Sequence, residues 1–144
     1  MNLMNNLAKL LYFKTVIGPE LLTICQYTTH QFTYPSSINQ TLKYILETNN
    51  LSLPIQIKQA KDILKIRKLI PIYINNHTIV FPIKAKRSPI QYFINALAIN
   101  GLKSQGAQTV IYFDNATFII VDVAYIVVHK KWQESLTLSH LIDS

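Results

Sequence analysis

The chain has 144 residues, of which 49% are hydrophobic and 15% are charged. That length and apolar content are enough to bury one hydrophobic core, which excludes an intrinsically disordered chain. Fourteen Lys and Arg residues against seven Asp and Glu give a net charge of +7, which favours polyanionic partners, nucleic acid first and an anionic membrane second.

The cysteine content bears on the cellular compartment. Cys25 is the single cysteine, which excludes an intramolecular disulfide framework and suits a reducing environment. The sequence has no apolar run long enough for a transmembrane helix. Its first residues lack the basic region and the small-residue cleavage site of a signal peptide. We therefore expect a cytoplasmic protein with no membrane partner.

The first elements in chain order are two strands and a helix. Residues 12–17 and 21–27 are rich in β-branched and aromatic side chains, and a Gly-Pro turn separates them. A helix over about 37–48 follows, because its apolar residues recur every three or four positions. Ser36 or Ser37 can cap its N-terminus. We therefore predict a hairpin followed by a helix with one buried face.

The next segment is ambiguous between helix and strand. Pro54 can open a short helix as far as Asp62, or the chain can pass directly into a strand. From residue 63 to 69 the pattern alternates loosely, which makes this stretch a candidate strand with its cations pointing outward. Residues 70–74 and 78–82 then flank an Asn-Asn-His turn sequence, which predicts a hairpin.

A second hairpin is predicted nearer the C-terminus. Residues 91–99 can form either a strand or a helix. Residues 109–113 and 116–121 have strand composition, and Asp114 and Asn115 between them are turn residues that tolerate a positive φ. This is the strongest hairpin signal in the chain.

The last element is a helix over about 123–140, with Asp122 as its expected N-cap. An apolar face runs through Tyr125, Val128 and Trp132, and Lys131 falls on the opposite, polar side. The whole chain, residues 1–144, is thus expected to be a single α+β domain. It has a mostly antiparallel sheet and two longer helices, about 37–48 and 123–140.

Catalytic chemistry has little support in the sequence. The four histidines are dispersed without metal-ligand spacing, and Cys25 lies in an apolar strand-like run. Seven acidic residues leave few candidates for paired acid–base catalysis, and the phosphate-binding Gly-rich motifs are missing. We therefore expect no enzyme, no metal site and no cofactor.

The distribution of positive charge is more informative. Eight of the 14 cations lie between residues 58 and 87, against one acid, Asp62. If residues 63–69 and the following hairpin are neighbours in one sheet, these cations converge on one edge and can bind several phosphates. A solvated surface is the alternative interpretation. The predicted DNA-binding residues are Lys58, Lys61, Lys65, Arg67, Lys68, Lys84, Lys86 and Arg87.

The mode of base recognition is less defined. The sequence has no helix-turn-helix, zinc-finger or basic-zipper pattern. Arg87, in a loop between two prolines, can enter a narrow A·T minor groove, where arginine is electrostatically favoured. Tyr92 and Phe93 can stack on unpaired bases, although their spacing is more typical of core residues.

Several of these motifs together resemble the ComK family of competence transcription factors, over about residues 10–136. They are Pro71-Ile72-Tyr73-Ile74, Val80-Phe81-Pro82-Ile83, Phe113-Asp114-Asn115-Ala116 and Asp122-Val123-Ala124-Tyr125. The sequence departs from the family pattern at Ile83, which stands where the family has Thr, and around Tyr92 and Phe93, where the family often has Trp. The acidic insertion near the N-terminus and the long C-terminal tail of fuller members are also missing. The chain therefore resembles a short paralogue.

The resemblance implies a DNA-binding activator of competence genes. Such a protein is expected to bind AT-rich promoter boxes through the minor groove, with Arg87 or Arg67 in the groove, as a homo-oligomer on the nucleoid. An alternative is a module that does not bind DNA and forms a heterodimer with a longer paralogue. Tyr125, Val128 and Trp132 are the expected oligomer interface. Binding to RNA or to the ribosome is a third, weaker interpretation.

Overall fold

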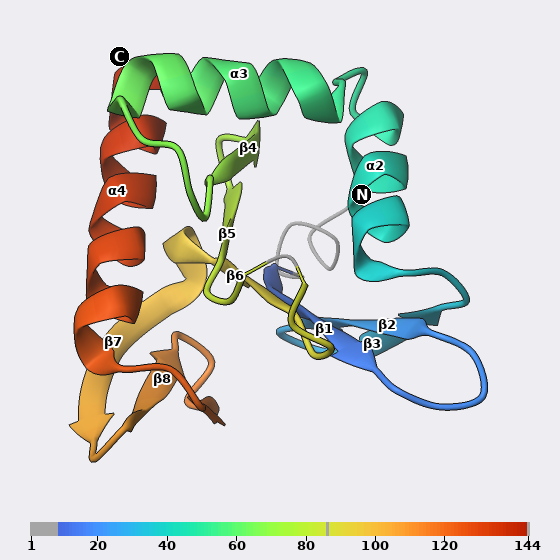
Figure 1. Ribbon diagram of the computed structural model, residues 1–144, viewed down its shortest axis with the longest axis vertical. Helices are drawn as coiled ribbons and strands as arrows, with labels where there is room; N and C mark the ends of the chain where they lie inside the picture. The colour runs from blue at the N-terminus through green and yellow to red at the C-terminus, as the bar shows by residue number, and fades with distance from the viewer. Residues whose placement is uncertain (1–8, 86, 144) are drawn as a thin grey trace.

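The computed structural model describes residues 9–85 and 87–143. In these residues, nine strands form antiparallel sheets and three α-helices pack around them, which confirms the predicted α+β fold. Figure 1 shows the helices α4, α3 and α2 on three sides of the strands. The helices are α2 (Ile38–Thr48), α3 (Leu53–Leu64) and α4 (Tyr125–Asp143).

Six strands form the larger sheet, in the order β3-β2-β1-β6-β5-β4. Their bounds are β1 (Leu10–Val16), β2 (Leu22–Tyr27), β3 (Gln31–Tyr34), β4 (Ile72–Asn75), β5 (Thr78–Pro82) and β6 (Tyr92–Asn95). The β1–β2 and β4–β5 hairpins confirm the two hairpins predicted in this part of the chain. Strand β3 was not predicted from the sequence.

The smaller sheet contains β7 (Ile99–Gln105), β8 (Gln108–Phe113) and β9 (Phe118–Val121), in that order. A 3-10 turn, η1 (Ala96–Ala98), leads from β6 directly into β7. The ambiguous residues 91–99 therefore hold a strand, a tight turn and the start of the next strand. The β8–β9 hairpin is confirmed, but Ala116, with φ 68°, takes the left-handed position that was expected at Asp114 or Asn115.

Helix α2 forms where its cap and its apolar spacing predict it. The Ser37 hydroxyl accepts a hydrogen bond from the Gln40 backbone N–H at 3.2 Å, which satisfies one of the free amides of the first turn. Ile38, Leu42 and Leu46 are buried on one face. Both the bounds and the buried face of this helix were predicted correctly.

Helix α3 settles the ambiguous segment in favour of a helix. Pro54 lies in its first turn, where the missing N–H costs nothing, and good helix formers follow. The helix ends at Leu64, and Lys65 takes a left-handed conformation, with φ 57°. The candidate strand over 63–69 is therefore wrong, because these residues are the end of α3 and the loop after it.

Helix α4 begins at Tyr125, two residues later than predicted, and Ala124 rather than Asp122 precedes it. Asp122 is therefore not its N-cap. Lys131 is buried, with 7% of its surface exposed, although the spacing placed it on the solvent side. The reason is that α4 packs against the sheet on one side and α3 at its end, so more than one stripe of this helix is covered.

The core lies on both faces of the larger sheet. Along β5, Ile79 and Phe81 pack in one cluster with residues of α4, and Val80 between them packs in a second cluster with residues of α2. Alternate side chains of a strand point to opposite faces, so one strand serves both clusters. Within the described residues, no helix is long and apolar enough to cross a membrane.

A buried amide joins the parts of the fold at the β6–η1 corner. Asn95 has no exposed surface, and its amide nitrogen donates to the Leu10 carbonyl at 2.7 Å and the His77 carbonyl at 3.3 Å. Its oxygen accepts from the backbone N–H groups of Ile79 and Leu97. One side chain thus links β1, the β4–β5 hairpin and the turn into the smaller sheet.

Candidate nucleic-acid interface

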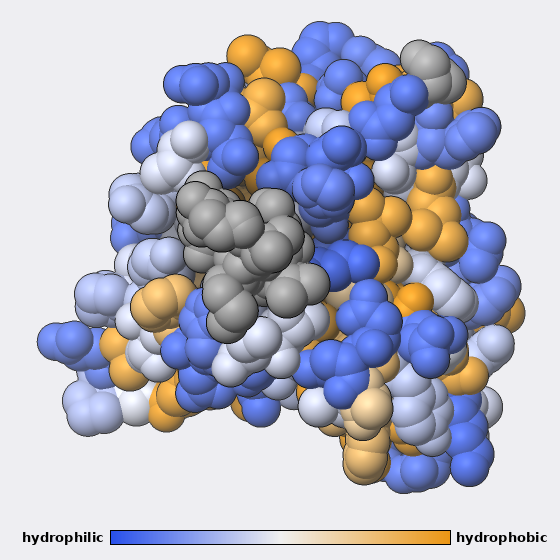
Figure 2. All heavy atoms as spheres, turned by 180° about the vertical axis from the view of Figure 1, so that it is seen from behind, coloured by the Kyte–Doolittle hydropathy of each residue, from blue (hydrophilic) through white to orange (hydrophobic). Residues whose placement is uncertain are grey.

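Three of the predicted DNA-binding residues lie on α3 or directly after it. Lys58 and Lys61 are exposed and three positions apart, which places them on one side of the helix, and Lys65 is exposed at its C-cap. The Lys58 ammonium contacts the Asp62 carboxylate at 2.8 Å, and this hydrogen bond raises the pKa of Lys58 and lowers that of Asp62. In Figure 2, the top of the molecule, where α3 runs, shows hydrophilic side chains interspersed with hydrophobic ones.

The C-terminus of α3 forms a cation-lined hollow. Lys61, Lys65, Ile66 and Arg67 surround a space of about 500 Å³, and none of these lining residues is acidic. The left-handed conformation of Lys65 ends the helix and turns the chain, so that Arg67 comes beside the last helical turn. Three positive charges around one concave surface raise the local potential and suit an anion such as a phosphate.

The loop after α3 is fastened to α4. The Lys131 ammonium donates a hydrogen bond to the Lys68 carbonyl at 3.0 Å and contacts the Glu134 carboxylate at 2.6 Å. The side chains of Lys131 and Glu134 are only 9% and 16% exposed. The loop that presents Arg67 and the exposed Lys68 is therefore held in place by a nearly buried ion pair.

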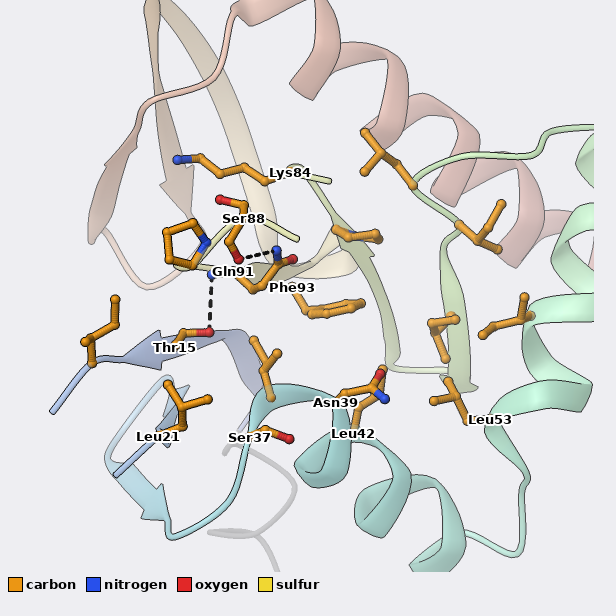
Figure 3. Close-up of a pocket in the computed structure, with 18 residues that line it drawn as sticks. Thr15, Leu21, Ser37, Asn39, Leu42, Leu53, Lys84, Ser88, Gln91 and Phe93 are labelled. Carbon is orange, nitrogen blue, oxygen red and sulfur yellow. Dashed lines mark hydrogen bonds between the residues drawn. The ribbon is translucent and has the colours of Figure 1, made fainter. Parts of the chain in front are cut away.

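The second group of cations lies in the loop between β5 and β6. Lys84 is half-buried and Arg87 is exposed, while Lys86 lies outside the described residues. The Gln91 amide nitrogen donates to the carbonyls of Ala85 at 2.6 Å and Ser88 at 2.9 Å, which closes the loop on itself. Figure 3 shows Gln91 bonded to Ser88 on one side and to Thr15 of β1 on the other.

The two groups of cations do not form the single sheet edge that the sequence predicted, because residues 63–69 are not a strand. Instead, both segments border one apolar groove of about 660 Å³. Leu69 and Ile70 from the loop after α3 line it, as do Lys84 and Ser88 from the β5–β6 loop. The two segments therefore meet at this groove through the apolar Leu69 and Ile70 on one side and Lys84 on the other, and Lys84 is the one cation among the described lining residues.

The family of the chain follows from a comparison with protein-family models. The model described as ComK protein matches residues 13–144, which is nearly the whole chain. The chain belongs to the ComK family. No match was found among the curated proteins or among the solved structures. Membership confirms the resemblance seen in the sequence and indicates a competence transcription factor rather than an enzyme.

The expected oligomer interface of this ComK family member is mostly packed inside its own chain. Val128 has no exposed surface, and the Trp132 indole N–H donates to the Ala96 carbonyl at 3.0 Å. Tyr125 is 36% exposed and stacks on His129. Among the three residues, Tyr125 offers the most surface to a second protein.

Groups that often carry catalysis are inert or scattered in the described part of the chain. Residues 9–85 and 87–143 contain no group of three His, Cys, Asp or Glu side chains that could hold a metal ion. Burial raises the pKa of the Cys25 thiol to about 12, so this thiol is protonated at neutral pH and is a poor nucleophile.

The sequence patterns did not identify two residues that position the basic loops, Gln91 and Lys131. Gln91 left a weak signal, since it is a polar residue at the entry to an apolar strand, next to a Pro-Ile step. Lys131 left none, because its partner carbonyl at Lys68 is 63 residues away in the chain. Both side chains act on the interface by donating hydrogen bonds to the backbone carbonyls of a loop.

Proposed function

We propose that this ComK family member is a transcriptional regulator that binds AT-rich promoter DNA and activates competence genes. The observation that carries the proposal is the hollow lined by Lys61, Lys65 and Arg67, where three cations meet without an acidic lining residue. Each such cation can neutralise one backbone phosphate and release a counterion. A protein acting in this way would work on the nucleoid.

The two basic segments have different roles in this proposal. Lys61, Lys65 and Arg67, with Lys58 and Lys68 beside them, hold the phosphate backbone and set the register on the duplex. Arg87 is exposed at the tip of the Gln91-braced loop, so it can enter a minor groove that is narrow at A·T pairs. Arg87 therefore carries the base preference, and the α3 cations carry the affinity.

A salt titration tests the phosphate role. Affinity for one AT-rich duplex is measured by fluorescence anisotropy at several salt concentrations, with the wild type and a Lys61→Gln/Lys65→Gln/Arg67→Gln variant. We expect the slope of log K against log salt to become shallower by about 0.9 for each lost phosphate contact. The matched control is Lys43→Gln/Lys103→Gln/Lys130→Gln, which removes the same charge from exposed positions on α2, β7 and α4. Equal slopes for the two variants would contradict the proposal.

The base preference is tested separately with Arg87→Lys, which keeps the charge but changes the shape of the cation. We expect the ratio of affinities for AT-rich and GC-rich duplexes to fall, while the salt slope stays the same. An unchanged ratio would remove Arg87 from base recognition. A preference for single-stranded RNA in the same assay would favour an RNA-binding function.

A second candidate function is a module that heterodimerises with a longer paralogue. The first turn of α4 favours it, since Ile126 is 76% exposed beside Tyr125. Large exposed apolar side chains are typical of protein contacts. This function would be supported over the first by two results together. The wild type should co-purify with a longer paralogue while the Ile126→Glu variant does not, and the wild type should have no measurable affinity for DNA. A homo-oligomer through the same turn would be seen as a larger species in analytical ultracentrifugation.

A further inference from the structure

The apolar groove between the two basic segments has the dimensions of a ligand site. Its volume of about 660 Å³ falls within the range of roughly 300–1,000 Å³ that small-molecule sites occupy. Its walls come from α2, α3, the end of β1, and the strands and loops around β4–β6. Leu42, Leu53, Ile57, Ile70, Ile72 and Phe93 are among the apolar side chains that line it.

Most polar groups of the lining are already bonded within the protein. The Gln91 amide binds Ala85 and Ser88, and the Ser88 hydroxyl donates to the Ile90 carbonyl. The Thr15 hydroxyl accepts from the Gln91 N–H, and the Ser37 hydroxyl caps α2. These groups have fewer hydrogen bonds to offer a ligand, so the groove favours a ligand with a long apolar part.

Two polar groups of the lining are not engaged in this way: the side-chain amide of Asn39, which is exposed, and the charged group of Lys84. Lys84 is half-buried at the groove, is its one cation among the described lining residues, and forms no ion pair with any described residue. None of the described lining residues is acidic. In Figure 3, Lys84 and Ser88 lie at one side of the space and Leu53 at the other. The site therefore offers one positive charge at one side of an apolar surface.

We propose that this groove binds a free fatty acid, with its carboxylate on the Lys84 ammonium and its acyl chain along the apolar walls. A single-chain carboxylate matches the groove in both charge and polarity. A peptide fits less well, because its backbone N–H and C=O groups would be buried against walls whose polar groups are engaged elsewhere. This inference does not rest on DNA binding, and its test contains no DNA.

The test is isothermal titration calorimetry of the full chain with decanoate, and with decanol as the neutral match. We expect saturable one-to-one binding of decanoate that is at least tenfold tighter than that of decanol. Lys84→Met should bring decanoate down to the affinity of decanol and leave decanol unchanged, while Lys84→Arg should retain most of the preference. Equal affinity of the wild type for both ligands would overturn the proposal.

A second pair of variants tests the apolar wall without endangering the fold. Leu21 lines the groove and is 53% exposed, so Leu21→Glu introduces a repelling charge at its mouth at little cost in stability. The matched control is Ile126→Glu, since Ile126 is 76% exposed and does not line the groove. Decanoate affinity should fall in the first variant only. Equal affinity in both would contradict the assignment to this groove.

Binding of a free fatty acid must be distinguished from binding to a lipid surface, because both present a negative charge next to acyl chains. Co-sedimentation with vesicles of an anionic phospholipid distinguishes the two sources. We expect no vesicle binding that decanoate can displace, because one cation and one groove suit a single chain. Displaceable binding to vesicles with no calorimetric signal for free decanoate would overturn the proposal in favour of a lipid surface.

Discussion

The nearly buried pair of Lys131 and Glu134 should control both the stability of the protein and the loop that presents Arg67. Replacing Lys131 with Met keeps most of the side-chain volume but removes the charge. The substitution breaks the 2.6 Å contact with Glu134 and the 3.0 Å hydrogen bond to the Lys68 carbonyl. It leaves the Glu134 carboxylate, 16% exposed, without this counter-charge.

The size of the effect follows from the burial of both groups. Breaking a fully buried ion pair costs about 3–5 kcal/mol of unfolding free energy, mostly because the remaining charge stays desolvated. The exposed fractions of 9% and 16% leave a little contact with water, so we expect the lower end of that range, about 3 kcal/mol, for Lys131→Met. Adding Glu134→Gln removes the stranded charge, and the double variant should lose only about 1–2 kcal/mol, chiefly the bond to Lys68.

The measurement is a double-mutant cycle by urea unfolding, with circular dichroism as the signal. The control is Lys130→Met, because the neighbouring Lys130 is exposed and makes no ion pair with a described residue. It should change the unfolding free energy by less than about 0.5 kcal/mol. The reasoning is refuted if the two single substitutions add up in the double variant, or if Lys131→Met is as mild as the control.

Three further predictions concern stability. Asn95→Leu should destabilise the fold by about 3 kcal/mol or more in urea unfolding, since it leaves several buried backbone groups without partners, whereas the exposed Asn76→Leu should change little. Ala116→Gly should raise the melting temperature. Glycine removes about 1–2 kcal/mol of strain at φ 68° and costs about 0.5–1 kcal/mol in chain entropy, which leaves a net gain in stability. A lowered melting temperature would contradict this. Stability should fall as the pH rises from about 9 towards 12, since burial raises the pKa of Cys25 and of Tyr27 to about 12, and these groups ionise first in the unfolded chain. The Cys25→Ala variant should lose less unfolding free energy between pH 8 and pH 10 than the wild type does. An equal loss in the two proteins would mean that other groups cause the alkaline destabilisation.

The parts of the fold that could be predicted from sequence are those with local signals. The Ser37 cap and the apolar spacing after it fix α2, and the Gly-Pro turn fixes the register of β1 and β2. The failure at residues 63–69 has a physical cause. No glycine marks the end of α3, because Lys65 takes the left-handed position that glycine usually fills, so the helix end left no sign in the sequence.

The candidate site shows the same limit. The grouping of cations over residues 58–87 is visible in the sequence, and the hollow at Lys61, Lys65 and Arg67 lies within that stretch. The groove is different, because its walls combine residues from Thr15 to Phe93. Contacts at that separation depend on the strand order of the sheet, in which β1 lies next to β6. Local patterns do not encode that order.

A common design links the two basic segments. Each is a loop that one largely buried polar side chain holds by its backbone carbonyls: Lys131 binds the Lys68 carbonyl, and Gln91 binds those of Ala85 and Ser88. Ordering a free loop costs about 1–2 kcal/mol per residue, which would weaken any partner that had to impose the order itself. Here the fold supplies that order in advance, so the proposed contacts with phosphate can contribute to affinity without that cost.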